Sequence, residues 1–398
     1  MKKFTLLLVG LLAFLPLVQA AEKPALSRIS SKECGQCHTR IYRQWSGSVH
    51  ARSTALQDAI HAFMYKAVMG DPTQEDLKDK AGNYPVCLQC HAPVAAREGK
   101  TKLDGDALYD EGVNCVTCHT MERHLGVKTP EGALRPGAKA YAFSSEALQG
   151  PNGAPHGQAA VVAPGSDGNA PTTNPYSHVA NPALFKSSGV CLGCHELLMN
   201  PQGVPVCTIG DKLLAGESPP TCQSCHMPVV DGVADHSMPG GHEAAMVKSA
   251  VNVAVSLRTE GESILATVSL ENTILHTFPN GAPFRNVRLQ VSGLDAGGNV
   301  VWKNPADDPN AVLMLKLVDE AGQPAMPMAA SRVAADTRLQ PGETRTLTYT
   351  LPAKEVVLVR AELFHNLVTK PMLEKLGESA PEEARKPVLA GSSEARPQ

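Results

Sequence analysis

The stretch GVNCVTCHTMERH, residues 112–124, holds two cysteines separated by two residues, a histidine directly after the second cysteine, and another histidine five residues later. Cysteine pairs at this spacing occur in zinc ribbons, in dithiol redox sites and at the attachment points of c-type haem. Taken alone, the stretch leaves all three kinds of site open, so the rest of the chain has to decide between them.

The same pattern occurs five times, and ten of the eleven cysteines belong to it. In c-type haem attachment, the two thiols add to the vinyl groups on one porphyrin edge, and the histidine that follows becomes the proximal iron ligand. Five complete repeats therefore predict five covalently bound haem c groups. The predicted thioether and proximal residues are Cys34, Cys37 and His38; Cys87, Cys90 and His91; Cys115, Cys118 and His119; Cys191, Cys194 and His195; and Cys222, Cys225 and His226.

The first twenty residues have the pattern of an export signal. MKK is positively charged, FTLLLVGLLAFLPL is a short apolar run, and VQA ends in small residues suited to cleavage. These features predict a signal peptide over residues 1–20 and a periplasmic or extracellular protein. No later run is long enough to predict an integral membrane segment in the mature chain.

Charge and composition narrow the choice of partners. The formal charge is −3, and loss of Lys2 and Lys3 with the signal peptide makes it −5, which argues against nucleic acid as a partner. Aromatic residues make up only 4% of the chain. Haem groups would supply the apolar bulk that the sequence lacks, and redox proteins are the expected partners.

The spacing of the motifs predicts a continuous chain of haems. The first cysteines lie at positions 34, 87, 115, 191 and 222, so the second and third motifs are close in sequence, as are the fourth and fifth. The chain is too short for most of five haems to lie far apart. We therefore expect neighbouring haems within electron-tunnelling distance.

Nine histidines remain after the proximal ones, and seven are candidate distal iron ligands. The candidates are His50, His61, His124, His178, His236, His242 and His276, while His156 and His365 complete the set. His50 and His61 lie eleven residues apart in a stretch that predicts a helix starting near Ser48, so they would share one face. His124 follows His119 too closely to round the rim of its own porphyrin, so we expect it at a neighbouring haem.

Three other candidate distal histidines lie next to predicted turns. His236 and His242 flank the Gly-containing sequence SMPGG, and His276 precedes a Pro-Asn-Gly turn at the end of a predicted strand. Cys207 is the cysteine left outside the five pairs. It is compatible with a buried apolar residue, an intermolecular disulfide or a thiolate ligand.

The C-terminal part has a different pattern. From residue 249, runs such as AVNVAVSLR and SILATVSLE alternate apolar and polar residues between turn signals. About seven short strands over residues 249–370 predict an immunoglobulin-like β-sandwich. The predicted organisation is therefore α+β: a helical and irregular haem-packed domain over residues 21–248, the β-sandwich, and a flexible tail over residues 371–398.

Several stretches together resemble a known family. CGQCHTRIYRQWSGSVHARS, residues 34–53, resembles the opening of the periplasmic tetrahaem cytochrome that takes electrons from hydroxylamine oxidoreductase, with Trp45 and the Ser-x-His-Ala sequence that ends in Ala51. CLQCHAP, GVNCVTCH and CLGCHE continue in the same order. CQSCHMP and DHSMPGGH resemble the closing segment of larger multihaem relatives that carry an appended β-domain. The resemblance covers about residues 32–290, and a fifth haem motif and the β-domain depart from the tetrahaem pattern.

This resemblance implies mostly bis-histidine haems and electron transfer. It also implies that His50 serves the haem on His119, and that His124 serves the haem on His38. Three functions stay open at this point. The first is an electron carrier, the second is an oxidoreductase of small nitrogen or sulfur compounds at one open haem, and the third is a subunit that forms filaments or docks on a complex through its β-domain. Self-association is thus a further option beside redox partners.

Overall fold

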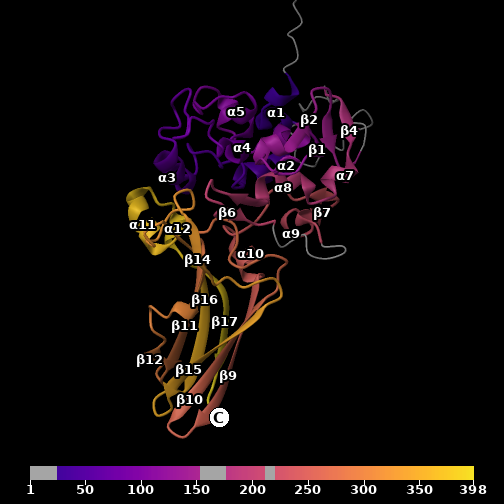
Figure 1. The fold of residues 1–398 in the computed structure, drawn as a ribbon. Helices are drawn as coiled ribbons and strands as arrows, with labels where there is room; N and C mark the ends of the chain where they lie inside the picture. The colour runs from indigo at the N-terminus through magenta and orange to yellow at the C-terminus, as the bar shows by residue number, and fades with distance from the viewer. Residues whose placement is uncertain (1–24, 153–175, 211–219) are drawn as a thin grey trace, which may run out of the picture.

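The computed structural model describes residues 25–152, 176–210 and 220–398. The predicted signal peptide, residues 1–20, and His156 lie outside the described residues. Figure 1 shows a part rich in short helices above a part built mainly from long strands. Helices and antiparallel sheets together place the chain in the α+β class. No helix among the described residues is both long and apolar enough to span a membrane.

The upper part consists of short helices joined by loops. Four of these helices end on the histidine of a Cys-x-x-Cys-His motif, because each motif itself forms about one helical turn. The α-helices are α1 Ser31–Gly35, α2 Thr39–Gly47, α3 Ala59–Val68, α4 Leu88–His91, α5 Pro93–Arg97, α6 Cys115–His119, α7 Pro182–Phe185, α8 Gly189–His195, α9 Cys222–His226 and α10 Ala244–Lys248, and the 3-10 helices are η1 Leu26–Arg28, η2 Ala107–Tyr109 and η3 Gly137–Ala140.

Small two-stranded sheets brace these helices. Three are antiparallel and one, between β3 and β4, is parallel. The strands pair as β1 Met121–His124 with β2 Tyr141–Phe143, β3 Leu148–Gly150 with β4 His178–Ala180, β5 Leu197–Met199 with β6 Pro205–Thr208, and β7 Val229–Val230 with β8 Val233–Ala234.

The predicted helix from Ser48 to beyond His61 is wrong in its first half. The structure forms turns after Ser48, and α3 begins only at Ala59. The Asp58 side chain accepts hydrogen bonds from the backbone N–H groups at the start of α3, which satisfies donors that a helix start leaves unpaired. His50 and His61 therefore do not share a helix face.

The lower part contains two antiparallel sheets that share one apolar core. The three-stranded sheet has the order β15-β10-β9, and the larger sheet has the order β14-β13-β11-β16-β17 with β12 paired to β11. The bounds are β9 Val251–Glu260, β10 Ser263–Asn272, β11 Asn286–Leu294, β12 Val300–Lys303, β13 Val312–Val318, β14 Arg332–Asp336, β15 Thr344–Pro352, β16 Leu358–Asn366 and β17 Val388–Ala395, with the 3-10 helix η4 Pro309–Ala311 before β13.

Alternation of side chains explains this core. Every second residue of β10 and β16 is buried, because successive side chains of a strand point to opposite faces. On β16 the inward row is Val359, Ala361, Leu363 and His365. The row thus ends on a histidine, which is only 3% exposed.

The predicted flexible tail over residues 371–398 is replaced by ordered structure. Lys370–Leu376 forms α11, η5 spans Gly377–Ser379, α12 spans Glu382–Arg385, and β17 pairs with β16 along almost its whole length. The sequence of β17 is polar and follows a proline, so it does not show the alternation of apolar residues that predicts a strand. As an edge strand, β17 exposes one face and needs few large apolar residues.

The two parts pack against each other at more than one point. In Figure 1, α11 and α12 lie beside α3. Ile60 and Phe63 of α3 belong to the same apolar cluster as Leu367 and Met372. These contacts hold the loops at the upper end of the β-sheets, including the one that carries His276, against the helical part.

Candidate functional site

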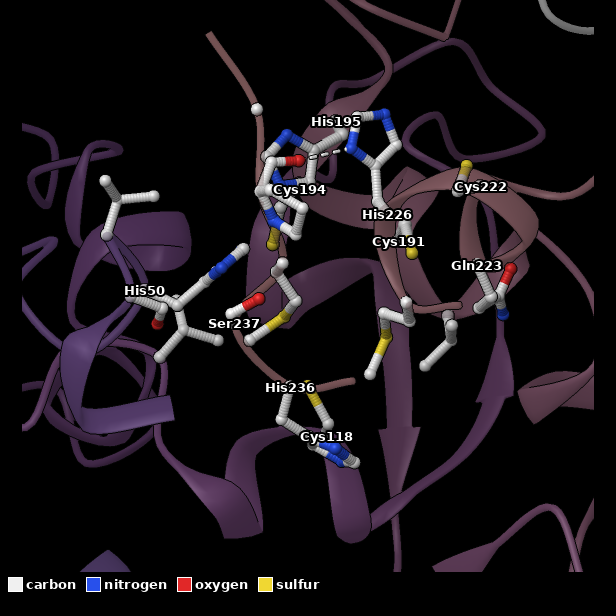
Figure 2. A pocket seen from close by; sticks show the side chains of 18 of the residues that line it. His50, Cys118, Cys191, Cys194, His195, Cys222, Gln223, His226, His236 and Ser237 are labelled. Atoms are coloured by element: carbon white, nitrogen blue, oxygen red, sulfur yellow. Dashed lines mark hydrogen bonds between the residues drawn. The ribbon is translucent and has the colours of Figure 1, made fainter. Parts of the chain in front are cut away.

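All five Cys-x-x-Cys-His motifs line one cavity of about 2530 Å³. Ordinary small-molecule pockets measure about 300–1,000 Å³, so this space suits several large groups. Figure 2 shows His50, His195, His226 and His236 reaching toward the shared space from different elements. Six of the seven predicted distal histidines line the cavity: His50, His61, His178, His236, His242 and His276.

The local fold of the third motif shows how a proximal histidine is aimed. Asn114 caps α6, since its side-chain oxygen accepts a hydrogen bond from the backbone N–H of Thr117 at 2.9 Å. The helix then ends at His119, whose Nδ1 lies 2.7 Å from the carbonyl oxygen of Gln149. A backbone carbonyl on Nδ1 fixes the tautomer and leaves Nε2 for a metal.

Two more proximal histidines are oriented in the same way. Nδ1 of His91 lies 2.9 Å from the Ser53 carbonyl oxygen, and Nδ1 of His226 lies 2.6 Å from that of Pro239. These contacts fit proximal iron ligation, because carbonyl partners of this kind usually orient metal-binding histidines.

Two pairs of imidazoles have the separation expected across an iron atom. Metal–imidazole bonds of about 2.0–2.1 Å, with the ring radius added on each side, put two opposed ring centres about 6–6.5 Å apart. His119 and His236 have ring centres 6.4 Å apart and planes inclined by 20°. His226 and His276 have ring centres 6.5 Å apart and planes inclined by 17°.

A third pair has a different relative orientation. The ring centres of His50 and His195 lie 5.9 Å apart, and their planes are inclined by 80°. The backbone of Gly112 and Val113 holds His50 in place. Val113 N–H donates to the His50 carbonyl at 2.9 Å, and a Cβ atom at Gly112, where φ is +63°, would lie 2.2 Å from the same oxygen.

This third pair differs from what the family resemblance implies. The resemblance places His50 at the haem on His119, whereas the structure brings His50 to His195 and His236 to His119. His236 comes from the segment after the fifth motif, which the tetrahaem pattern does not contain. In this chain, the segment after the fifth motif thus supplies the histidine that faces His119, in place of His50.

His61 does not oppose the proximal histidine that it contacts. Its ring stacks on that of His91 with the centres 3.8 Å apart and the planes inclined by 26°. Both Nδ1 atoms contact the same Ser53 carbonyl at 2.9 Å, so both Nε2 atoms point to the same side. The Nε2 atom of His61 is buried and has no hydrogen-bond partner.

The remaining candidates have different surroundings. His124, on β1, is absent from the cavity lining and packs against Tyr141, with the ring centres 5.3 Å apart. His178 lines the cavity from β4, against Gly150. His242 lines it near Arg285. Cys207, on β6, is half-buried and also lines the cavity.

Thiols from different motifs lie against each other and show which motifs are neighbours. Cys34 contacts Cys115, Cys191 contacts Cys222, and Cys194 contacts Cys90. These contacts, together with burial, raise the pKa values of Cys34, Cys191 and Cys194. The first motif thus adjoins the third, and the fourth adjoins both the second and the fifth.

Burial keeps several histidines of the cavity neutral. Burial and, as a smaller effect, nearby histidines lower the pKa of His50 and of His119 to about 4. Burial, followed by the nearby His50 and His91, lowers the pKa of His195 to about 3. The neutral imidazole is the form that binds a metal, so the donor set fits haem iron near neutral pH.

Arg285 is a lining residue without a signal in the sequence. It follows the turn after His276 and reaches into the cavity, where its charge acts on His195 and His242. A single arginine in a loop has no spacing pattern that could have identified it. His365 lines the same region from β16, and its Nδ1 is buried without a hydrogen-bond partner.

The chain is similar to known multihaem proteins. The family described as cytochrome c554 and c-prime matches residues 33–120. A pentahaem cytochrome c552 from Thermochromatium tepidum is 45% identical, with a TM-score of 0.86 over 94% of this chain and 100% of that chain. A superoxide reductase in the oxidised state matches at 12% identity and a TM-score of 0.20, over 37% of this chain and 86% of that chain, which is too distant to indicate a shared fold. No curated protein matches the chain.

Proposed function

This chain belongs to the family of the pentahaem cytochrome c552, the multihaem c-type cytochromes, and from this membership we propose that it binds five haem c groups and passes single electrons along them between redox partners. Covalent haem c supplies a one-electron iron couple in such proteins. The observation that carries the proposal is the convergence of all five motifs and three opposed imidazole pairs on one cavity.

Three distal ligands follow from the imidazole pairs. We assign His236 to the haem on His119, His276 to the haem on His226, and His50 to the haem on His195. For the haem on His38 we keep His178 as the candidate, because the charges of both residues act on His119 and both line the cavity.

The thiol contacts support a branched order of haems. The motif that ends at His195 contacts the second and fifth motifs through its two cysteines, and Cys118 of the third motif lies near Cys194. We propose that the haem on His195 is the junction through which electrons reach the others. The second and third motifs, close in sequence, would then communicate through the fourth.

Haem content and spin state test this function together. The purified holoprotein should contain five haems per chain, measured by mass spectrometry and a pyridine haemochrome assay. Low-temperature EPR of the oxidised protein should give low-spin signals for the three assigned pairs. Near-perpendicular imidazole planes at His195 should produce a strongly anisotropic signal, distinct from the rhombic signals of the two near-parallel pairs. Fewer than five haems, or three high-spin irons, would contradict the proposal.

A second function is favoured by the arrangement at His91. Because His61 stacks beside His91 with Nε2 on the same side, it does not occupy the position opposite the proximal ligand. This haem is the candidate site for an oxidoreductase that acts on a small nitrogen or sulfur compound. The buried, unpartnered Nε2 of His61 would then be available to a bound group.

Ligand binding distinguishes the carrier from the enzyme. An open iron should bind carbon monoxide after reduction and cyanide after oxidation, with a stoichiometry of one per chain. Turnover of hydroxylamine, nitrite or tetrathionate would establish the enzyme. A chain whose five haems are all low-spin and bind neither probe is a carrier alone.

We also propose that the protein works in the periplasm or outside the cell, where c-type haem is attached and where the apolar N-terminal run would direct it. The proposed role of the β-sheets is that of an immunoglobulin-like scaffold that completes the haem cavity and presents a surface to redox partners. Fractionation of cells and cross-linking of the holoprotein test these two statements separately.

A further inference from the structure

Arg285 is a buried cation that lines the haem cavity. Burial lowers its pKa, and Cys207 and Asp58 are the described groups whose charges oppose this effect. Nη1 of Arg285 donates to the carbonyl oxygen of Asn280 at 3.2 Å, and no described carboxylate forms an ion pair with this arginine. The guanidinium carries five N–H donors. Most of its hydrogen-bonding capacity therefore remains for a group inside the cavity.

Two glycines hold this guanidinium in position. A Cβ atom at Gly241 would lie 2.8 Å from Nη1 of Arg285, and one at Gly281 would lie 2.9 Å from it. Gly241 belongs to the segment after the fifth haem motif, and Gly281 belongs to the turn after β10. The arginine is thus packed between backbones from the two parts of the molecule, which fixes its position.

The surroundings identify the haem that Arg285 faces. Arg285 and His195 line the same cavity. The glycine Gly210 packs against the backbone carbonyl of His195, and the neighbouring Ile209 reaches Gly281. The loop that carries Arg285 is therefore adjacent to the fourth motif.

A buried cation that is not directly paired with a counter-charge is costly, whereas a guanidinium paired with a carboxylate forms strong, often two-pronged hydrogen bonds. Each haem carries two propionate carboxylates. We propose that Arg285 binds a propionate of the haem held by His195 and thereby raises the reduction potential of that haem. The inference rests on the proposed haem arrangement.

The expected sign follows from electrostatics. A fixed positive charge near the iron favours the reduced state, which carries one positive charge less, and removal of that charge favours the oxidised state. Replacing Arg285 with glutamine should therefore lower one midpoint potential of the holoprotein. Arg285→Lys keeps the charge and should leave that potential closer to its original value, although lysine cannot form the two-pronged contact.

The test is a spectroelectrochemical titration of the complete holoprotein with a matched control. Arg97→Gln removes another half-buried arginine, whose guanidinium lies 3.9 Å from the centre of the Phe143 ring and does not line the cavity. We expect R285Q to shift one of five potentials downward and R97Q to shift none. Resonance Raman spectra of R285Q should show a change in one propionate bending mode.

A second variant covers the case in which R285Q does not fold. Gly241→Ala keeps the charge but places a methyl group against Nη1, so the same potential should move by a smaller amount. Unchanged potentials and Raman modes in a variant that still holds five haems would overturn the inference and leave the proposed function intact. A wild-type protein that holds fewer than five haems would instead count against the proposed function.

A free anion is the alternative source of negative charge. If a small anion rather than a propionate occupied Arg285, exchanging chloride for phosphate would move the affected potential in wild type and not in R285Q. That result would overturn the assignment to a propionate. An insensitive wild-type potential, with the R285Q shift, supports it.

Discussion

Backbone carbonyls orient several of the imidazoles in the cavity. The partners of His91, His119, His226 and His236 are all main-chain oxygens within 2.9 Å of Nδ1. The main chain rather than a second layer of acidic side chains therefore determines which ring nitrogen is left for iron.

Replacing His236 with alanine should convert one haem from low-spin to high-spin. The imidazole opposite His119 would be lost, while both thioether bonds of the third motif would still hold the haem, so the haem count should stay at five. Low-temperature EPR and the haemochrome assay measure the two quantities.

His242→Ala is the matched control for this prediction, since His242 lines the same cavity but faces no other imidazole among the described residues. An unchanged spin state in H236A, or an equal change in both variants, would contradict the assignment of His236.

The stability of the protein should fall in acid partly because of His365. Burial, followed by the charges of Arg285 and His242, lowers the pKa of His365 to about 3. In the unfolded chain the same group titrates near 6.5, so the unfolded state binds more protons between these values and stability is lost as pH falls through this window. Between pH 6.5 and pH 4 this one group should cost about 3 kcal/mol.

His365→Phe removes that titration and keeps a ring against Phe278. In the wild-type protein the ring centres of His365 and Phe278 lie 6.1 Å apart. Denaturant unfolding of wild type and variant at pH 7 and pH 4 measures the difference. If the free energy of unfolding decreases by the same amount in both proteins between pH 7 and pH 4, His365 does not cause the loss of stability in acid.

At the scale of single residues, the sequence predicts the covalent haem attachment, which follows from the spacing within each motif. It does not predict which distant histidine comes to face each proximal histidine in the folded chain. The five motifs predict covalent haem, and the membership of a multihaem c-type cytochrome family confirms that prediction. The partner of each proximal histidine could not be read from the chain. His236 reaches His119 from more than a hundred residues away, and His124, only five residues from His119, lies outside the cavity lining.

Among the elements, β17 shows best how a strand can escape notice. It follows two short helices, carries few large apolar residues, and still pairs with β16 from Val359 to His365. Helix α3 shows the opposite error, since a plausible periodic pattern extended the helix across turns that Asp58 excludes by capping the next turn. Local pattern identified the type of element in the long strands, where alternation runs for nine or ten residues.

Removing residues 387–398 should destabilise the protein by at least about 2 kcal/mol, because uncovering one or two apolar side chains costs roughly this amount. The deletion takes away β17 and exposes the core that Ala390, now 1% exposed, helps to cover. Denaturant unfolding measures the loss. Deleting only residues 396–398, which follow β17, should have little effect, and a similar result for both deletions would contradict the prediction.

At the scale of the whole molecule, the haem cavity is built by both parts of the chain. His276 lies beyond β10 in the strand-rich part, yet its ring faces that of His226 across 6.5 Å. A single His276→Ala substitution in the full chain should therefore turn the haem on His226 high-spin while the β-sheets stay folded. EPR measures the spin state of the haem, and far-ultraviolet circular dichroism measures whether the β-sheets stay folded.

His365→Phe serves here as a control in the same part of the molecule, because it changes a lining histidine whose stacked neighbour is Phe278 and not another imidazole. If H276A keeps every haem low-spin, the ligand of the haem on His226 comes from elsewhere. If one haem does become high-spin, the strand-rich part completes a haem site, and the predicted haem domain and β-domain are better described as one functional unit.

The position of His276 also has a consequence for biogenesis. The ribosome makes both cysteines of the fifth motif more than fifty residues before it makes this histidine, so a haem can be attached to Cys222 and Cys225 while its iron still lacks the final protein ligand. The spectrum of that haem then reports whether the end of the chain has arrived and folded. In a protein truncated directly after the fifth motif, His236 and His276 would be missing, so the haems on His119 and His226 should become high-spin while all haems stay covalently attached. This difference separates finished from unfinished molecules without any assay of electron transfer.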